Sequence, residues 1–213
     1  MKQKHGNQHG YTMIEVILYI SILGVLGVVL TNYAYRGFTR YRIGRVSQQV
    51  IDLKRAILQY SAVYDDYLSI RLNDMHNKRS IPLDMRNSAT EARHALGGAV
   101  TLGPSTELPY ATENYTDNKY MFYMTFSTIS HSSCIEILTQ GHFYSDGGDL
   151  DAIVTFDEDS PGSYKLFYYE HSFFGSTLSK DASRKITMNR LTMEQAQDAC
   201  SSNMRNSITW IFS

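Results

Sequence analysis

Residues 11–35 read YTMIEVILYISILGVLGVVLTNYAY, and this stretch governs how the whole chain is organised. It contains a single charged side chain, Glu15. As a helix rising 1.5 Å per residue it would be about 37 Å long, enough to cross a hydrocarbon core of about 30 Å. An ordinary N-terminal anchor would have this length. A cleaved secretory signal fits less well, because no Ala-x-Ala-like cleavage site follows the apolar run.

Glu15 is the informative residue of this span. A carboxylate inside an apolar segment costs about 3 kcal/mol on insertion scales unless it finds a partner. The preceding residues, MKQKHGNQHG, form a short basic polar leader that ends in Gly10. A cut between Gly10 and Tyr11 would create an amine four residues before Glu15, and the two charges could then neutralise one another. The simpler alternative is a tolerated defect in an ordinary anchor.

The stretch GYTMIEVILYISILGVLGVV, residues 10–29, resembles the N-terminus of type IV prepilins. That family combines a short basic leader, a Gly before the cut, an apolar residue after it and a Glu at the fifth mature position. Gly10, Tyr11 and Glu15 occupy those places, although Phe, Met or Leu is more usual than Tyr at the first mature position. Asn32 stands at the twenty-second mature position, where many IVa pilins have proline, so the chain is more like the type IVb group.

The resemblance implies processing and assembly roles for these residues. A prepilin peptidase would cut after Gly10, and Tyr11 would then be N-methylated. Glu15 would pair with the Tyr11 amine of a neighbouring subunit and set the axial register of a filament. The positive-inside rule argues for the opposite topology, because four arginines follow the span: Arg36, Arg40, Arg42 and Arg45. We give the specific leader more weight than the general rule.

A second helical pattern follows the apolar span. Apolar residues recur at alternating steps of three and four, which predicts an amphipathic helix that packs on a sheet: Ile43, Val46, Val50, Leu53 and Ile57. No proline occurs before Pro82. We therefore expect one unbroken helix from about Thr12 to about Val63.

The remaining residues predict an α+β head in which this helix packs on an antiparallel sheet. Pro and Gly residues between 64 and 118 indicate a long irregular connection with one short helix near Glu91 to Leu96. Capping signals at Ser133 with Glu136, and at Thr192 with Gln195, predict two further helices. Aromatic and β-branched runs predict strands at Lys119–Ser130, Asp151–Phe156, Tyr164–Glu170 and the C-terminal SITWIFS, which would bury Ile208, Trp210 and Phe212 on one face.

The predicted organisation has three parts. Residues 1–10 are the leader, residues 11–63 the long helix with its hydrophobic membrane or filament-core segment at 11–35, and residues 64–213 the head. The head divides into a loop region, 64–118, and a sheet and disulfide-bounded region, 119–213. This order of elements also resembles the layout of type IVb pilins.

Cys134 and Cys200 are the only cysteines. In an exported domain, two cysteines predict one disulfide. A free thiol pair or a metal site would be the alternatives, but no third and fourth ligands stand at a recognisable spacing. In the resemblance to type IVb pilins, the first cysteine lies in a short helix after a strand and the second precedes the last strand.

The motifs of common enzyme classes are missing from the sequence: no Walker loop, G-x-G-x-x-G, H-E-x-x-H or G-x-S-x-G is present. The net charge of −1 favours no nucleic-acid partner. Asp146, Asp149 and Asp151 could form a hard-cation site, but their spacing differs from that of an EF-hand and a solvated turn is the simpler interpretation. We expect no enzymatic activity, no cofactor and no metal.

Together these patterns predict the structural subunit of a type IV pilus, similar to the IVb group, which serves adhesion, aggregation or conjugative contact. The expected partners are other copies of the chain, a prepilin peptidase, minor pilins and an inner-membrane assembly platform with its ATPase. The precursor would lie in the inner membrane and the product in an extracellular filament. The alternatives are a minor pilin or pseudopilin of a type II secretion system, or a signal-anchored periplasmic binding module.

Overall fold

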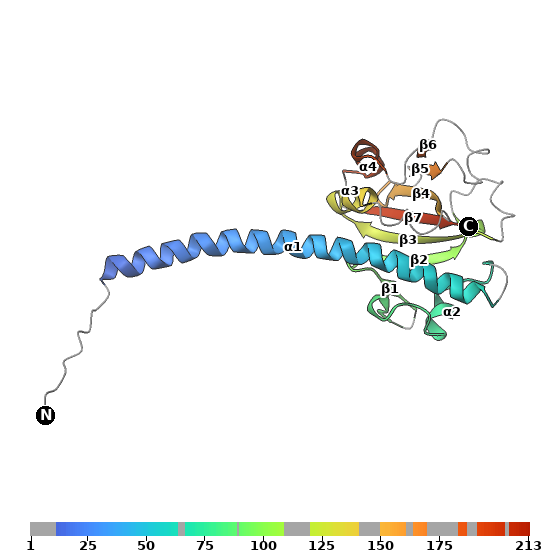
Figure 1. Ribbon diagram of the computed structural model, residues 1–213, viewed down its shortest axis with the longest axis horizontal. Helices are drawn as coiled ribbons and strands as arrows, with labels where there is room; N and C mark the ends of the chain where they lie inside the picture. Colours follow the sequence, from blue (N-terminus) through green and yellow to red (C-terminus); the bar gives the residue numbers. More distant parts are fainter. Residues whose placement is uncertain are drawn as a thin grey trace, which may run out of the picture. The chain divides into compact units, whose positions relative to one another are not determined.

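The computed structural model describes residues 12–63, 67–88, 90–108, 120–140, 150–160, 164–169, 183–186, 191–202 and 205–213. The chain divides into two compact units, Met1–Tyr41 and Arg42–Ser213. A single helix, α1 (Met13–Ser61), provides the described part of the first unit and the opening element of the second (Figure 1). Its ends lie within two residues of the predicted ones, as expected for a segment that contains no proline.

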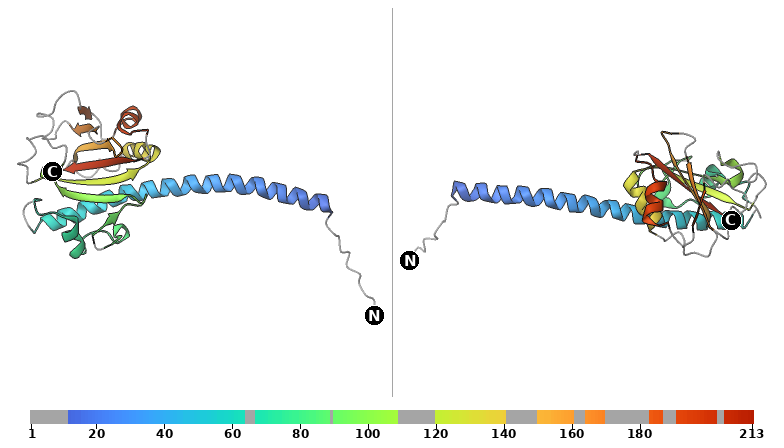
Figure 2. Two further views of the ribbon diagram at one scale, coloured as in Figure 1. Left: turned by 180° about the vertical axis from the view of Figure 1, so that it is seen from behind. Right: turned by 90° about the horizontal axis from the view of Figure 1, so that it is seen from above.

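The second unit, which we call the head, contains a seven-stranded sheet in the order β1-β2-β3-β7-β4-β5-β6. All neighbouring pairs are antiparallel except β5 and β6, which are parallel. The C-terminal strand β7 therefore lies in the middle of the sheet, between β3 and β4 (Figure 2). The strands are β1 (Ala92–Arg93), β2 (Ala99–Pro104), β3 (Phe122–Ile129), β4 (Leu150–Asp157), β5 (Tyr164–Tyr169), β6 (Ser183–Ile186) and β7 (Asn206–Phe212).

The main hydrophobic core lies between this sheet and the second half of α1. The apolar stripe that begins at Ile43 is buried against side chains of β3 and β7. The predicted inner face of β7 is confirmed, since Ile208, Trp210 and Phe212 all belong to this core. The opposite face of β7 is also buried, because the strand is central and a smaller apolar cluster covers that side: Leu108, Met121, Ala152, Val154, Leu166 and Ile211.

The region between α1 and β3 is more regular than predicted. It contains a helix, two short 3-10 turns and two strands: α2 (Leu72–Asn77), η1 (Leu83–Met85), β1, β2 and η2 (Ser105–Glu107). The short helix expected near Glu91 to Leu96 is wrong, because Ala92 and Arg93 pair with β2 as a strand. The turn that follows contains Gly97 with a φ of +96°, a conformation that ends a helix rather than continuing one.

A buried histidine holds the β1–β2 turn against β3. The His94 Nε2 atom is 2.8 Å from the Ser127 carbonyl oxygen, and the Leu96 N–H donates to His94 Nδ1 at 3.2 Å. This pair of contacts describes a neutral ring that carries its proton on Nε2. Burial lowers the pKa of His94 below its ordinary value, with a smaller opposing effect from the hydrogen bond to Ser127 and the charge of Glu158. Protonation of Nδ1 would remove the Leu96 contact.

A polar network ties the second half of α1 to the same region. The buried Gln49 accepts a hydrogen bond from the Ala95 N–H at 2.8 Å through Oε1. Its Nε2 donates to Asp84 at 2.8 Å, and Asp84 also forms an ion pair with Arg45 at 3.0 Å. Both polar atoms of the Gln49 amide are hydrogen-bonded, so burying this polar residue on the packed face of α1 costs little free energy. Its two partners also fix the segments around Asp84 and Ala95 beside the helix.

Candidate assembly site

The first unit presents an apolar helical surface with no covering side chains among its described residues. The large apolar side chains from Met13 to Tyr41 are between 44% and 83% exposed. Within the described part of the chain, α1 is the one helix that is long and apolar enough to cross a membrane by length and composition. A surface of this size demands a membrane or other protein chains around it, because apolar patches on soluble monomers rarely exceed a few hundred Å².

Four polar side chains in this segment form hydrogen bonds within the helix itself. Ser21 and Thr31 donate to the carbonyl oxygens four residues earlier, each at 2.8 Å, and Thr39 does so at 3.0 Å. Asn32, which stands where the resemblance to pilins would place the IVa proline, donates through Nδ2 to the Val28 carbonyl oxygen at 3.0 Å. The helix stays continuous there, and its polar groups remain compatible with an apolar environment.

Glu15 lies in the first turn of α1 and is half-buried. Its backbone N–H donates to the Thr12 carbonyl oxygen at 3.0 Å. None of the ion pairs among the described residues includes Glu15. The helix dipole stabilises a carboxylate in the first turn by a fraction of a kcal/mol. This is less than the free-energy cost of placing the charge in an apolar environment. Gly10 and Tyr11, the predicted processing residues, lie outside the described part of the chain.

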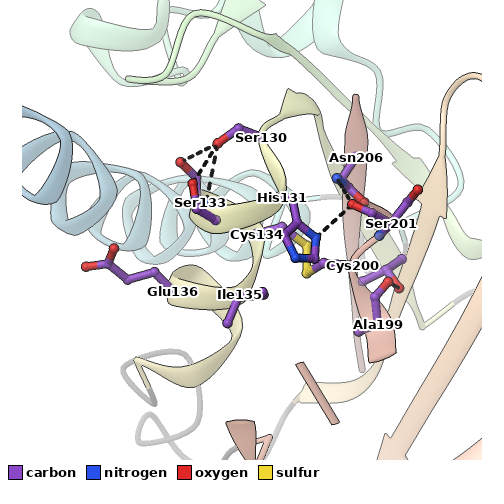
Figure 3. The surroundings of a disulfide bond; sticks show 12 residues. Ser130, His131, Ser133, Cys134, Ile135, Glu136, Ala199, Cys200, Ser201 and Asn206 are labelled. Carbon is purple, nitrogen blue, oxygen red and sulfur yellow. Dashed lines mark hydrogen bonds between the residues drawn. A yellow bond between two sulfur atoms is a disulfide. The ribbon is translucent and has the colours of Figure 1, made fainter. Parts of the chain in front are cut away.

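The two cysteines belong to two adjacent short helices. Cys134 is in α3 (His131–Thr139), and Cys200 caps the C-terminal end of α4 (Met193–Ala199). The structure joins them by a disulfide with a Cα–Cα distance of 6.0 Å, and both are buried (Figure 3). Because both sulfur atoms are used in the disulfide, the structure shows no free thiolate at Cys134 or Cys200 that could bind a metal. Among the described residues no group of three or more metal-ligating side chains occurs anywhere.

Local capping explains where these helices begin. The predicted capping box at Thr192 and Gln195 is confirmed, with both reciprocal hydrogen bonds present. The cap predicted at Ser133 is wrong, because α3 begins three residues earlier. Ser130 is in the extended conformation and its hydroxyl accepts from the Ser133 N–H, so Ser133 sits inside the first turn. Two serines three residues apart give the sequence no means of choosing between them.

A polar frame around the disulfide was missed by sequence reasoning. The carbonyl oxygen of Ser201 is 2.8 Å from His131 Nδ1 and 3.1 Å from the Asn206 amide nitrogen, as the dashed lines of Figure 3 show. The Ser201 hydroxyl donates to Asp157 at 2.9 Å. The segment after Cys200 is thus fixed to α3, β4 and β7 at once. These residues are separated by up to 75 positions in the sequence, so no local sequence pattern could predict the hydrogen bonds to Ser201.

The candidate cation turn is only partly described. Asp146 and Asp149 lie outside the described residues, and Asp151 is a buried residue of β4. In the described residues after β4, the Ser160 N–H donates to the Asp157 carbonyl oxygen at 3.1 Å and forms a turn.

Comparisons with known proteins agree with the motif and the fold. Residues 5–31 match the family model described as the prokaryotic N-terminal methylation motif. The crystal structure of a type IVb pilin from Salmonella typhi is similar with a TM-score of 0.50 and 14% sequence identity, over 78% of this chain and 97% of that one. The crystal structure of TcpA, a type IV pilin from the Vibrio cholerae El Tor biotype, has a TM-score of 0.48 and 12% sequence identity. The match covers 81% of this chain and 99% of that one.

A sequence comparison with curated proteins gives no match. At 14% identity the Salmonella structure supports the fold alone. The matched motif concerns only the N-terminal residues 5–31. The expected α+β class, with a long N-terminal helix packed on a mainly antiparallel sheet, is confirmed. Pilins are structural subunits and not enzymes. The chain thus carries the prokaryotic N-terminal methylation motif and shares its fold and IVb-like layout with a type IVb pilin.

Proposed function

We propose that the chain is a structural subunit of a type IVb-like pilus. The observation that carries this function is the overlap between the methylation motif, residues 5–31, and a helical segment whose apolar side chains are exposed along its length. A prepilin peptidase cuts the precursor between Gly10 and Tyr11, and Tyr11 is N-methylated. The product polymerises into an extracellular filament for adhesion, aggregation or conjugative contact.

Burial of the exposed helix stabilises the filament against the water that surrounds it once it leaves the membrane. Covering one Val, Leu, Ile, Phe or Met side chain is worth about 1.5 to 3 kcal/mol. The segment from Met13 to Leu30 exposes more than a dozen such residues. Lipid covers them in the precursor, and neighbouring copies of the same helix cover them in the filament. Because both environments are apolar, transfer between them is far cheaper than exposure to water.

Glu15 provides the specificity that apolar packing lacks. Its carboxylate has no cation among the described residues nearby, and cleavage after Gly10 creates one on Tyr11. In the filament this amine and the Glu15 carboxylate of a neighbour neutralise one another and fix the axial register. The machinery that this proposal requires comprises an inner-membrane assembly platform, its ATPase and minor pilins. The precursor resides in the inner membrane, with the pilus at the bacterial surface.

The register role is tested by Glu15→Val. We expect normal membrane insertion, because a charge is removed from an apolar span, and no filaments, because the intersubunit ion pair is lost. Glu194→Val is the matched control: Glu194 is exposed in the first turn of α4 and should assemble normally. Filaments are counted by electron microscopy after shearing. A normal filament yield from Glu15→Val would remove the register role.

The processing step is tested by mass spectrometry of the membrane-resident and filament forms. Both should begin at Tyr11 and carry one methyl group on its amine. A form beginning at Met1 would contradict the proposal and indicate a signal-anchored binding module. Expression of this chain with the assembly machinery and its minor pilins, but without another major pilin, should still give long filaments. Short or absent filaments there would indicate a minor pilin or a pseudopilin of a secretion system.

A further inference from the structure

A band of aromatic and basic side chains surrounds α1 between its apolar span and its packed half. Its four aromatic side chains are 69% to 74% exposed. Two exposed arginines lie among them, one helical turn apart. We call this band the collar, and it consists of Tyr33, Tyr35, Arg36, Phe38, Arg40 and Tyr41.

The collar encircles the helix, whereas a helix face that packs on a single neighbouring sheet forms a stripe. At 100° per residue, Tyr33, Tyr35 and Tyr41 point in directions that differ by about 80° or more, and Phe38 fills the interval between the last two. The second half of the same helix shows what a packed face looks like: a stripe that begins at Ile43 and is buried on one side only. A ring of amphipathic side chains suits a medium that surrounds the helix.

The position of the collar matches a membrane interface. From Thr12 to Tyr33 the helix rises about 30 Å, which is the thickness of a hydrocarbon core. With the start of α1 at one interface, the collar reaches the opposite one. Tyr is enriched at this level because its ring is apolar and its hydroxyl polar, and arginines there contact phosphate.

Charge balance favours lipid phosphate over a neighbouring helix as the partner of the arginines. Between residues 12 and 51 the sequence contains one acidic residue, Glu15, against four arginines. Under the proposed function, Glu15 is already matched by the Tyr11 amine. Where the segments from residue 12 to residue 51 of identical helices pack together, they therefore offer no further carboxylate to Arg36 and Arg40. Phosphodiester headgroups supply that anion, and a guanidinium binds two of their oxygens at once.

We propose that the collar binds anionic phospholipid headgroups in the membrane leaflet nearer to the head, and so holds the subunit at a fixed depth before assembly. This inference rests on the proposed function, because it needs a membrane-inserted precursor. Each arginine near an anionic surface contributes about 1 kcal/mol, so the pair predicts a preference of roughly 30-fold for anionic over zwitterionic lipid. The preference should fall as ionic strength rises.

The test uses the full mature protein in detergent, titrated with phosphatidylglycerol or phosphatidylcholine and analysed by native mass spectrometry. Wild type should bind phosphatidylglycerol tens of times more tightly. Arg36→Gln/Arg40→Gln should bind the two lipids alike, while Arg36→Lys/Arg40→Lys should keep most of the preference. The matched control is Arg55→Gln/Arg93→Gln, which removes two exposed positive charges from the head and should behave as wild type.

Two results would overturn the inference: equal binding of both lipids by wild type, or an equal loss of preference in the control. A Gln double variant that keeps its lipid preference but makes no filaments would also overturn it, and would assign the arginines to a subunit contact. The lipid measurement uses monomers and does not depend on polymerisation. Its failure is therefore distinguishable from failure of the proposed function, which would appear as a wild-type chain that forms no filament.

Discussion

Replacing both cysteines by alanine measures how strongly the disulfide stabilises the head. Cys134 and Cys200 are 66 residues apart. In the chain-entropy model a cross-link over a loop of this size removes unfolded-state entropy worth about 4 kcal/mol at 25 °C. Alanine leaves no hydroxyl in the buried site, so no unsatisfied polar group adds to the cost. With a urea m-value of about 2 kcal/mol/M, the unfolding midpoint of Cys134→Ala/Cys200→Ala should fall by about 2 M.

The single tryptophan makes the assay simple. Trp210 is fully buried in the central strand β7, so its fluorescence reports unfolding of the head. The mature protein would be unfolded in urea with and without reductant. Reductant should shift wild type to the midpoint of the variant and leave the variant unchanged. A variant midpoint within about 0.5 M of oxidised wild type would refute the loop-closure reasoning, since that shift corresponds to only about 1 kcal/mol.

Two further predictions concern the turn between β1 and β2. Burial lowers the pKa of His94 below 6.5, so the unfolded chain takes up this proton first. The contribution of neutral His94 to the free energy of unfolding is complete above about pH 7 and is lost as the pH falls below 6.5. Urea unfolding midpoints measured from pH 5 to 8 should therefore decrease toward low pH, and His94→Gln should make this decrease smaller. Gly98→Ala would place a Cβ 1.8 Å from the Ser127 carbonyl oxygen and should lower the thermal midpoint sharply. Gly44→Ala, with no atom within 4 Å of its Cβ, should instead stabilise α1 by about 1 kcal/mol; equal effects of the two substitutions would contradict the close approach at Gly98.

Elements with a strong local period were predicted well. Helix α1 lies where its apolar spacing placed it, and strands β3, β4, β5 and β7 lie where aromatic and β-branched runs placed them. The two misplaced features, a helix near Glu91 and a cap at Ser133, lie where local signals are weak or duplicated. At Glu91 the outcome depends on pairing with β2, a contact that no window around residues 91–96 contains. At Ser133 a second serine three residues earlier offers an equivalent cap.

The sequence by itself determined that α1 has an apolar first part, with one carboxylate near its N-terminus, and an amphipathic second part. The uninterrupted apolar run, the lone Glu15 and the stripe from Ile43 are properties of neighbouring residues on one helix, and helical geometry is local. The processing role that we propose for Gly10 and Tyr11 likewise rests on their place beside that run.

Only the tertiary structure decided the strand order, the packing of α3 beside α4 and the environment of His94. The last strand, β7, pairs with β3 and β4 across up to 90 residues of chain. The cysteines come within disulfide reach because α3 and α4 lie side by side, and His94 is buried because β1 and β2 close over Ser127. Each of these contacts joins residues far apart in the chain. Their energies depend on which surfaces meet, and no local pattern carries that information.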